Sequence, residues 1–110
     1  MAEDEEEIDD GTAGGTAVIT EKKIKLERPP LFKVLLHNDD YTSMEFVVYI
    51  LEQIFHKNAA DAEKIMMAVH QMGVGVAGVY PFEIAEAKVN KVTMLARQRE
   101  FPLRCSLEQE

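Results

Sequence analysis

The sequence has a single cysteine, Cys105, no tryptophan and no long apolar run. One cysteine cannot form a disulfide within the chain, which is typical of a protein from a reducing compartment. The longest strictly apolar run, residues 46–51, is far shorter than a membrane span requires. The first residues carry neither the basic region nor the apolar stretch of a signal peptide. We therefore expect a soluble, cytoplasmic protein with no membrane partner.

Basic residues are scarce, with 12 Lys and Arg against 20 Asp and Glu, for a formal net charge of −8. Residues 3–10 contain seven of these acids and no base, so residues 11–110 hold 13 acids against the 12 bases. A nearly neutral body behind an acidic end lacks the basic patches that bind phosphate, so we expect no nucleic-acid partner.

The length of 110 residues allows one domain, and an apolar fraction of 46% is that of a globular protein. Composition changes near residue 30, where the acidic run, a glycine-rich stretch and a basic patch end at Pro29-Pro30. We expect residues 1–30 to be a flexible extension, first acidic and then basic, and residues 31–110 to form the core domain.

The core begins with a strand-turn-helix pattern. Residues 31–37 are a short apolar run, typical of a buried strand, and residues 38–41 have turn composition. Thr42 and Glu45 match a capping box, so we expect Thr42 to be the N-cap of a helix over residues 43–55.

Two further helices and two strands follow. A second helix is expected over residues 59–71, capped by Asn58 and ended by Gly73. A strand over residues 74–80 precedes a third helix that starts at Pro81. The predicted inner faces are Ala62, Ile65, Met66 and Val69 in the second helix and Ile84, Ala85, Val89, Val92 and Ala96 in the third.

Alternation of Leu103, Cys105 and Leu107 with polar residues predicts a final, half-exposed strand. The order of elements is therefore βααβαβ. This order predicts a compact α+β domain with a three-stranded antiparallel sheet and three helices on one of its faces.

The polar residues that invite a function are Asn38, Asp39, Asp40 and His70. An amide oxygen, carboxylates and a neutral imidazole nitrogen all accept hydrogen bonds, so together they suit a small cation with several N–H donors, such as an α-amino group. Each piece also has a simpler interpretation, because Asn-Asp-Asp is ordinary turn composition and a single histidine is commonly a surface residue. Metal binding that includes His37 matches no familiar spacing, and no nucleophile, phosphate-loop or dinucleotide motif supports an enzyme.

Methionine is the second clue. Met44 lies one turn past the acidic loop, and Met66 and Val69 share a helix face with His70. Methionine commonly fills gaps in a core, but it also lines apolar pockets that accept more than one shape. An apolar pocket beside the acceptor residues is therefore expected as an alternative to simple core packing.

Several motifs, taken in order, resemble the ClpS family, the adaptors of bacterial Clp proteases. The similar stretches are KVLLHNDDYTSMEFV (33–47), IM (65–66), VHQ (69–71), GVG (73–75), GVY (78–80), AEAKV (85–89), ARQ (96–98) and FPLRC (101–105). The resemblance covers essentially all of residues 31–108 and none of the segment before Pro29.

The resemblance implies an adaptor, not an enzyme, that has no cofactor or metal. Such an adaptor binds N-terminal Leu, Phe, Tyr or Trp residues of substrates, which are the primary N-degrons. The adaptor acts as a monomer, delivers these substrates to the ClpAP protease and modulates the specificity of ClpA. It implies that Asn38, Asp39, Asp40 and His70 hold the α-amino group, that Leu36, Thr42, Met44, Val47, Met66, Val69 and Leu103 line the side-chain pocket, and that Glu83 and Lys88 dock on the N-domain of a ClpA-type AAA+ unfoldase. Met44 matches the family's gatekeeper against β-branched residues.

The departures from the family pattern include His37, where an aliphatic residue is frequent, and Ala87, where Thr or Ser is common beside Lys88. Two other classes of function stay open at this point. One is a small hydrolase or metal enzyme that uses Asp39, Asp40 and His70. The other is a structural partner domain, like the C-terminal domain of the ribosomal stalk protein.

Overall fold

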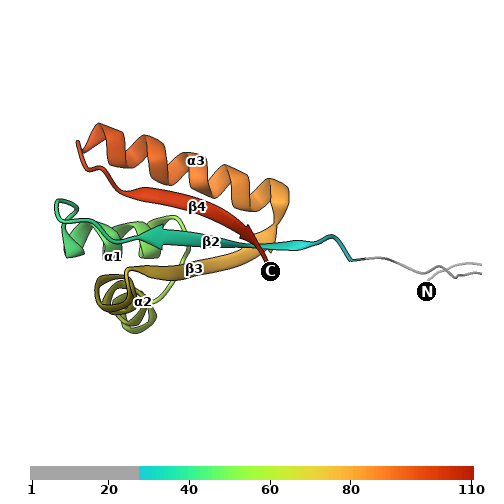
Figure 1. The fold of residues 1–110 in the computed structure, drawn as a ribbon, viewed down its shortest axis with the longest axis horizontal. Helices are drawn as coiled ribbons and strands as arrows, with labels where there is room; N and C mark the ends of the chain where they lie inside the picture. Colours follow the sequence, from blue (N-terminus) through green and yellow to red (C-terminus); the bar gives the residue numbers. More distant parts are fainter. Residues whose placement is uncertain (1–27) are drawn as a thin grey trace, which may run out of the picture.

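The computed structural model describes residues 28–110 (Figure 1). Of the predicted extension, residues 1–30, only residues 28–30 belong to the described part, and residues 1–27 lie outside it. The elements are β2 (Leu31–His37), α1 (Met44–Gln53), α2 (Ala59–Met72), β3 (Val74–Pro81), α3 (Phe82–Gln98) and β4 (Arg104–Gln109). In this described part, no helix is long and apolar enough to cross a membrane.

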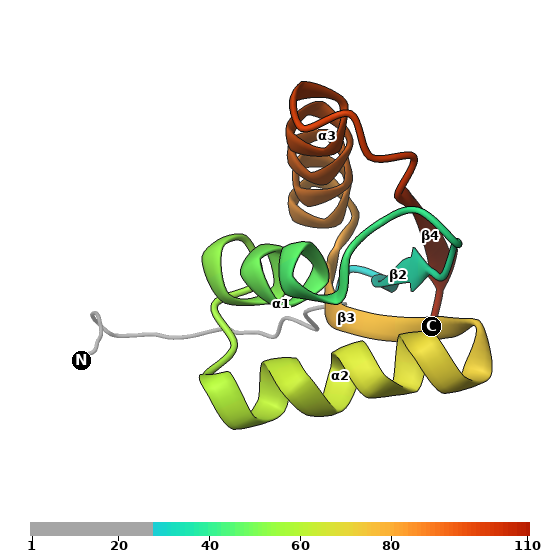
Figure 2. The same cartoon turned by 90° about the vertical axis from the view of Figure 1, so that its left-hand side faces the viewer.

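The three strands form one sheet in the order β3-β2-β4, and both pairs are antiparallel. β2 is therefore the central strand, and the register of its pairing with β3 shifts between Val34 and Leu35. All three helices lie on one side of the sheet, as Figure 2 shows. The predicted α+β fold with βααβαβ order is confirmed.

The core lies between the sheet and the helices because the central strand alternates buried and less buried residues. Val34 and Leu36 are fully buried, and Ile50 and Leu51 of α1 are equally inaccessible. Within residues 28–110, the other buried hydrophobic residues are Phe46, Val47, Ile54, Phe55, Ala62, Met66, Val69, Ala77, Ala85, Val92, Ala96 and Leu103. This layer anchors the loop after β2 and the second helix, which carry the predicted site.

Both predicted signals at the ends of α2 are confirmed. The Asn58 side chain accepts a hydrogen bond from the Asp61 backbone N–H at 2.8 Å, which satisfies a free donor at the start of the helix. Gly73 ends the helix with φ = 89°, a left-handed conformation that glycine adopts without a steric penalty.

The predicted cap of α1 is wrong. Ser43, not Thr42, is the N-cap, and its hydroxyl accepts from the Phe46 backbone N–H at 3.1 Å. The Thr42 hydroxyl is engaged elsewhere, because it donates to the Asp39 carboxylate at 2.7 Å.

The third helix also differs in detail from the prediction. Pro81 is its N-cap, one residue before the first helical turn. Ile84, expected on the inner face, is 49% exposed, whereas Ala85, Val92 and Ala96 are buried as predicted. Ile84 lies about 100° around the helix from Ala85, so it can point away from the sheet while Ala85 faces it.

Candidate functional site

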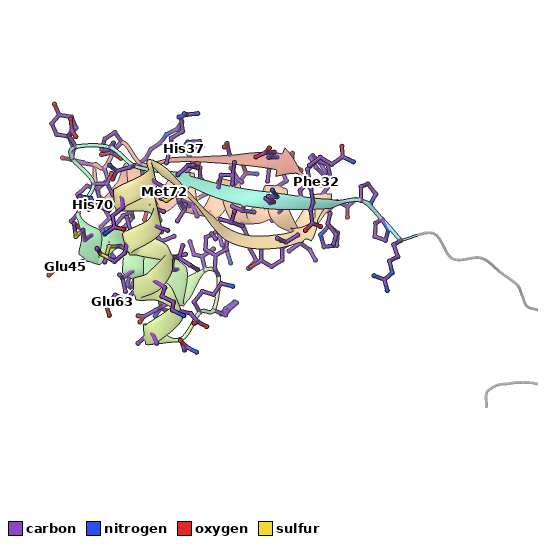
Figure 3. The ribbon with its side chains drawn as sticks, turned by 60° about the horizontal axis from the view of Figure 1, so that its bottom comes forward. Phe32, His37, Glu45, Glu63, His70 and Met72 are labelled. Atoms are coloured by element: carbon purple, nitrogen blue, oxygen red, sulfur yellow. The ribbon has the colours of Figure 1, made fainter. Side chains whose placement is uncertain are left out.

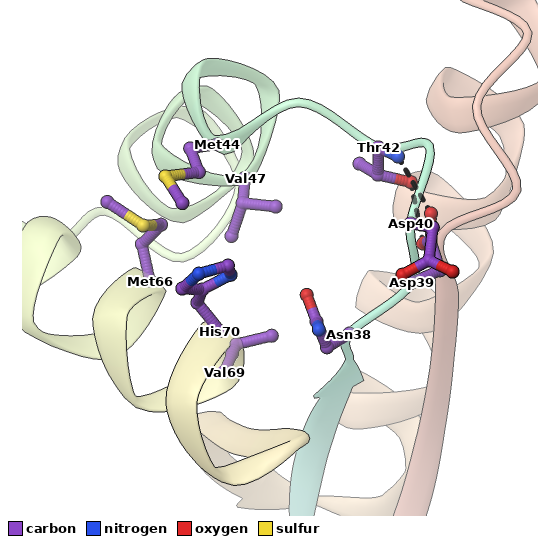
Figure 4. A pocket seen from close by; sticks show the side chains of 9 residues that line it. All are labelled: Asn38, Asp39, Asp40, Thr42, Met44, Val47, Met66, Val69 and His70. Atoms are coloured by element: carbon purple, nitrogen blue, oxygen red, sulfur yellow. Dashed lines mark hydrogen bonds between the residues drawn. The ribbon is translucent and has the colours of Figure 1, made fainter.

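A cavity of about 270 Å³ opens between the loop after β2, the start of α1 and the end of α2 (Figure 4). Its walls are formed by Asn38, Asp39, Asp40, Thr42, Met44, Val47, Met66, Val69 and His70. The four predicted amine-binding residues and five of the seven predicted side-chain-binding residues therefore meet in one place, although they come from three separate segments.

One wall of the cavity is apolar and comes from the two helices. Val47 of α1 and Met66 and Val69 of α2 are buried, at 6%, 7% and 2% exposure. Met44, in the first turn of α1, is 44% exposed and stands at the mouth. The cavity therefore offers a fixed apolar wall with one flexible methionine at its edge.

The opposite wall is rich in hydrogen-bond acceptors and comes mainly from the loop. The Asn38 backbone N–H donates to the Gly73 carbonyl at 2.9 Å, which ties the end of β2 to the end of α2. This contact brings the Asn38 and His70 side chains to the same cavity, where both are exposed to solvent and face its interior (Figure 4). Asp40 is exposed on the same loop.

Asp39 has a different role from Asp40 because its carboxylate is already engaged within the loop. Its Oδ1 accepts from the backbone N–H groups of Tyr41 at 2.8 Å and Thr42 at 2.7 Å, and its Oδ2 accepts the Thr42 hydroxyl. Burial acts to raise the pKa of Asp39, but these three hydrogen bonds outweigh it and hold the pKa below its ordinary value. The Asp39 carboxylate is therefore ionised and shapes the turn.

Two residues expected in the side-chain pocket do not line the cavity. Leu36 is fully buried in the core. Leu103 is buried as well and lines a second cavity, beside Arg97 and Arg104. Both were assigned by resemblance alone, and the other five residues named for the pocket line the cavity together with the four named for the amine group.

Gly75 shapes the cavity indirectly, and site prediction from the sequence did not include it. A Cβ at this position would lie 2.7 Å from Val69 Cγ2 and 3.5 Å from the Ile65 carbonyl oxygen. The absence of a side chain therefore lets α2 approach the sheet and sets where Val69 stands. The signal in the sequence was the run of small residues in this strand.

The two residues predicted to dock on a partner have unlike surroundings. Glu83 is exposed in the first turn of α3. Lys88 donates from Nζ to the Ile54 carbonyl at 2.7 Å, and its Nζ lies 5.2 Å from the centre of the Tyr80 ring. Burial, with a smaller contribution from Lys91, lowers the pKa of Lys88. Lys88 is thus also a structural residue.

His37 contacts a serine outside the cavity, on the strand next to it. His37 Nε2 lies 2.7 Å from Ser106 Oγ, and Arg104 Nη2 lies 3.5 Å from His37 Nδ1. A guanidinium can only donate, so a hydrogen bond from Arg104 needs Nδ1 as its acceptor, and this arrangement fits a neutral ring with its proton on Nε2. Burial first, and Arg104 second, lower the pKa of His37.

Catalytic or metal chemistry gains no support from the other titratable residues. Within residues 28–110, no three His, Cys, Asp or Glu side chains come together in a way that could hold a metal ion. His37 and His70 lie toward the same end of the molecule, whereas Phe32 marks the opposite end of β2 (Figure 3). The residues gathered at the first cavity are thus acceptors and apolar groups, the composition of a binding site.

Comparison with known proteins decides the family. The sequence model of the family described as ATP-dependent Clp protease adaptor protein ClpS matches residues 27–106. The chain belongs to the ClpS family. As a ClpS protein it is an adapter of the ATP-dependent Clp protease system and not an enzyme, and its partners are the protease machinery and the substrates.

Individual ClpS relatives agree over nearly the whole sequence. The ATP-dependent Clp protease adapter protein ClpS of Phenylobacterium zucineum is 53% identical over 104 residues, which cover 94% of this chain and 95% of the relative. The ClpS of Parvibaculum lavamentivorans is 49% identical over 110 residues and the whole of both chains. The solved structure of Agrobacterium tumefaciens ClpS2 bound to L-phenylalaninamide is 40% identical and superposes with a TM-score of 0.73, covering 76% of this chain and 100% of that one.

Proposed function

We propose that the cavity binds the N-terminal residue of substrate proteins, with Leu, Phe, Tyr and Trp as its ligands. We further propose that the chain delivers those substrates to a ClpA-type unfoldase of the Clp protease in the cytoplasm. The observation that carries the proposal is the division of one cavity into a wall of acceptors and an apolar wall. An N-terminal residue presents the matching pair of groups, a cationic amine and a side chain, on a single carbon.

The acceptor wall is suited to an α-ammonium group. Such a group has three N–H donors and a pKa of about 7.7–8.0, so it is charged at neutral pH. The Asn38 amide oxygen, the Asp40 carboxylate and a ring nitrogen of His70 supply three acceptors around one volume. Charge-assisted hydrogen bonds contribute about 1.5–3 kcal/mol each. Asp39 holds the turn that presents its two neighbours.

The apolar wall is suited to a large unbranched or aromatic side chain. Burial of a Leu or Phe side chain contributes about 1.5–3 kcal/mol. Val47, Met66 and Val69 form the wall on which such a side chain would pack. Met44 at the mouth would crowd substituents on the ligand's Cβ, and this disfavours Val and Ile.

The ligand of the ClpS2 relative supports this assignment. L-Phenylalaninamide carries a free α-amino group, a benzyl side chain and an amide, which is what an N-terminal Phe presents at the start of a peptide. The matched identity of 40% over the whole of that chain makes the same class of ligand the natural one here.

For delivery, we propose that Glu83 and Lys88 meet the N-domain of the unfoldase, and that the adapter acts as a monomer. Glu83 is exposed and can pair with a basic partner residue. Lys88 also holds α3 to the Ile54 carbonyl, so its replacement would affect both docking and packing. Glu83→Gln is therefore the cleaner test of docking, with pull-down of the unfoldase N-domain as the readout.

The direct test of the pocket is fluorescence anisotropy with one labelled peptide that begins with Phe, Leu, Val or N-acetyl-Phe. We expect tight binding of Phe and Leu, and loss of binding on acetylation because the amine loses its charge and two donors. Asp40→Asn and His70→Ala should each weaken binding at least about tenfold, or ~1.4 kcal/mol. Glu63→Gln, on the exposed side of α2 and outside the cavity lining, is the control. Equal binding of Phe and acetyl-Phe, or unchanged binding by both variants, would exclude this function.

A further inference from the structure

A second cavity of about 310 Å³ is lined by residues from the C-terminal end of α3 to the start of β4. Figure 1 shows the connection between these two elements. Its walls are Thr93, Ala96, Arg97, Phe101, Pro102, Leu103, Arg104 and Cys105. None of these residues lines the first cavity. The second cavity is therefore a separate candidate for a binding site.

The charge of this cavity is positive. Arg97 and Arg104 both line the cavity and are exposed to solvent. Among the described residues, no Asp or Glu lines it. Burial raises the pKa of the Cys105 thiol to about 12, so this group stays neutral and adds no negative charge. Two guanidinium groups on a wall whose described residues include no carboxylate favour an anionic occupant.

The floor of the same cavity is apolar. Ala96 and Leu103 are buried at 1% and 6% exposure, and Phe101 packs its ring 4.8 Å from that of Phe46. Pro102 adds a further carbon-rich surface. The ligand chemistry that matches both features is an acidic segment with an apolar side chain among its acids.

We propose that this cavity docks residues 3–10 of the same chain, with Ile8 entering the apolar floor and the flanking acids facing Arg97 and Arg104. Residues 3–10 contain seven acids, no base and one large apolar residue, Ile8. No other stretch of the sequence has this composition. The docked run neutralises the two arginines and is held by several weak, exposed ion pairs together with one buried side chain.

The length of the intervening chain allows this contact. Arg104 is the strand partner of His37, and Leu31 lies six residues earlier on the same strand, so the start of β2 is about 20 Å from Arg104. Residues 11–30 can span about 66 Å when extended, which is ample. A tether of this kind presents the acidic run at an effective concentration on the order of a millimolar, so a weak contact can be well populated.

The test compares backbone amide chemical shifts of the full chain with those of a full chain in which residues 5, 6, 7, 9 and 10 are changed to Gln or Asn. We expect shift differences at Thr93, Arg97 and Arg104 at low salt. These differences should vanish as salt rises from about 0.05 to about 0.5 M, because screening weakens exposed ion pairs. They should not change with protein concentration, since the contact lies within one chain.

Variants of the cavity provide the matched comparison. Arg97→Gln combined with Arg104→Gln, and separately Ile8→Ser, should abolish most of the shift differences. Arg99→Gln is the control, because Arg99 lies over the Tyr49 ring at 5.2 Å and does not line the cavity. Identical spectra for the parent and the neutralised chain would overturn the proposal, as would an equal effect of Arg99→Gln. Shifts that grow with protein concentration would also overturn it, because they would place the acidic run on a second copy. The neutralising substitutions leave residues 28–110 unchanged, so this result does not depend on how the arginine variants fold.

Discussion

The Thr42 hydroxyl donates to Asp39 Oδ2 at 2.7 Å while the Thr42 backbone N–H donates to Asp39 Oδ1 at 2.7 Å. This double contact closes the turn between β2 and α1. It also takes the Thr42 side chain away from the helix, so Ser43 becomes the N-cap. One carboxylate thus determines both where the helix starts and how the loop presents Asn38 and Asp40.

Asp39→Asn should therefore destabilise the fold, whereas Asp40→Asn should not. An amide at position 39 keeps one acceptor for the backbone but loses the charge and the acceptor for the Thr42 hydroxyl. The folded-state pKa of Asp39 is depressed, so its stabilisation is present above its ordinary pKa of 3.8 and is lost as pH falls through the lower folded value. In urea titrations, the difference between the parent and Asp39→Asn should be clear at pH 7 and should shrink well below pH 3.8.

The matched comparison is ligand binding. Asp40→Asn should lose affinity for an N-terminal Phe peptide with little change in the urea midpoint, since Asp40 is exposed. Equal destabilisation by the two substitutions would show that Asp39 has no special role in the turn.

Met44→Ala should broaden the choice of N-terminal residue. Met44 is 44% exposed at the mouth, so its truncation removes an obstacle without opening the core. We expect binding of peptides that begin with Val or Ile to improve at least about tenfold, while binding of a Phe peptide stays within a few-fold of the parent. Anisotropy titrations with peptides that begin with Val, Ile and Phe measure this. Met72→Ala is the control, because Met72 is 76% exposed and lies outside the cavity lining. A parallel change for all peptides would argue against a gate.

Gly75→Ala should change the shape of the pocket by displacing Val69. The new Cβ would lie 2.7 Å from Val69 Cγ2, so Val69 must move into the cavity or α2 must shift away from the sheet. We expect a loss of Phe-peptide affinity of about tenfold or more, with a lower melting temperature.

Gly78→Ala is the matched control for this substitution. It lies on the same strand, but its added Cβ would meet the outer end of the Tyr80 side chain. Gly78→Ala should lower the melting temperature and leave the peptide affinity unchanged. Similar affinities for both alanine variants would mean that the approach of α2 to Gly75 does not shape the pocket.

His37→Gln should remove a pH dependence of stability. Burial and Arg104 lower the folded-state pKa of His37 from its ordinary value of 6.5, so the unfolded chain binds a proton more readily. The stabilisation is complete above pH 6.5 and declines as pH falls through the lowered value. Urea midpoints of the parent, measured at intervals below pH 7, should decline more steeply than those of His37→Gln. His56→Gln, at an exposed position, is the control.

Much of the local structure could be predicted from short-range signals. The run of residues 31–37, the Asn58 cap and Gly73 act within one turn or strand, and each stands where it was expected. Most residues of the cavity could also be predicted from the sequence, because a loop of hydrogen-bond acceptors and a helix face with methionine are patterns in neighbouring residues. The family resemblance then joined these pieces, and the match over residues 27–106 confirmed the family.

What the sequence determined by itself was the set of elements, their order and the chemistry available to the site, because these depend on residues close together along the chain. Only the tertiary structure decided which groups share a cavity. The hydrogen bond from the Asn38 backbone N–H to the Gly73 carbonyl joins residues that are 35 positions apart. The Asp39 carboxylate accepts the Thr42 hydroxyl, which the sequence pattern had assigned to the helix cap. Leu36 is buried in the core and Leu103 lines the second cavity for the same reason, since the packing of the whole fold decides which buried side chains border a cavity.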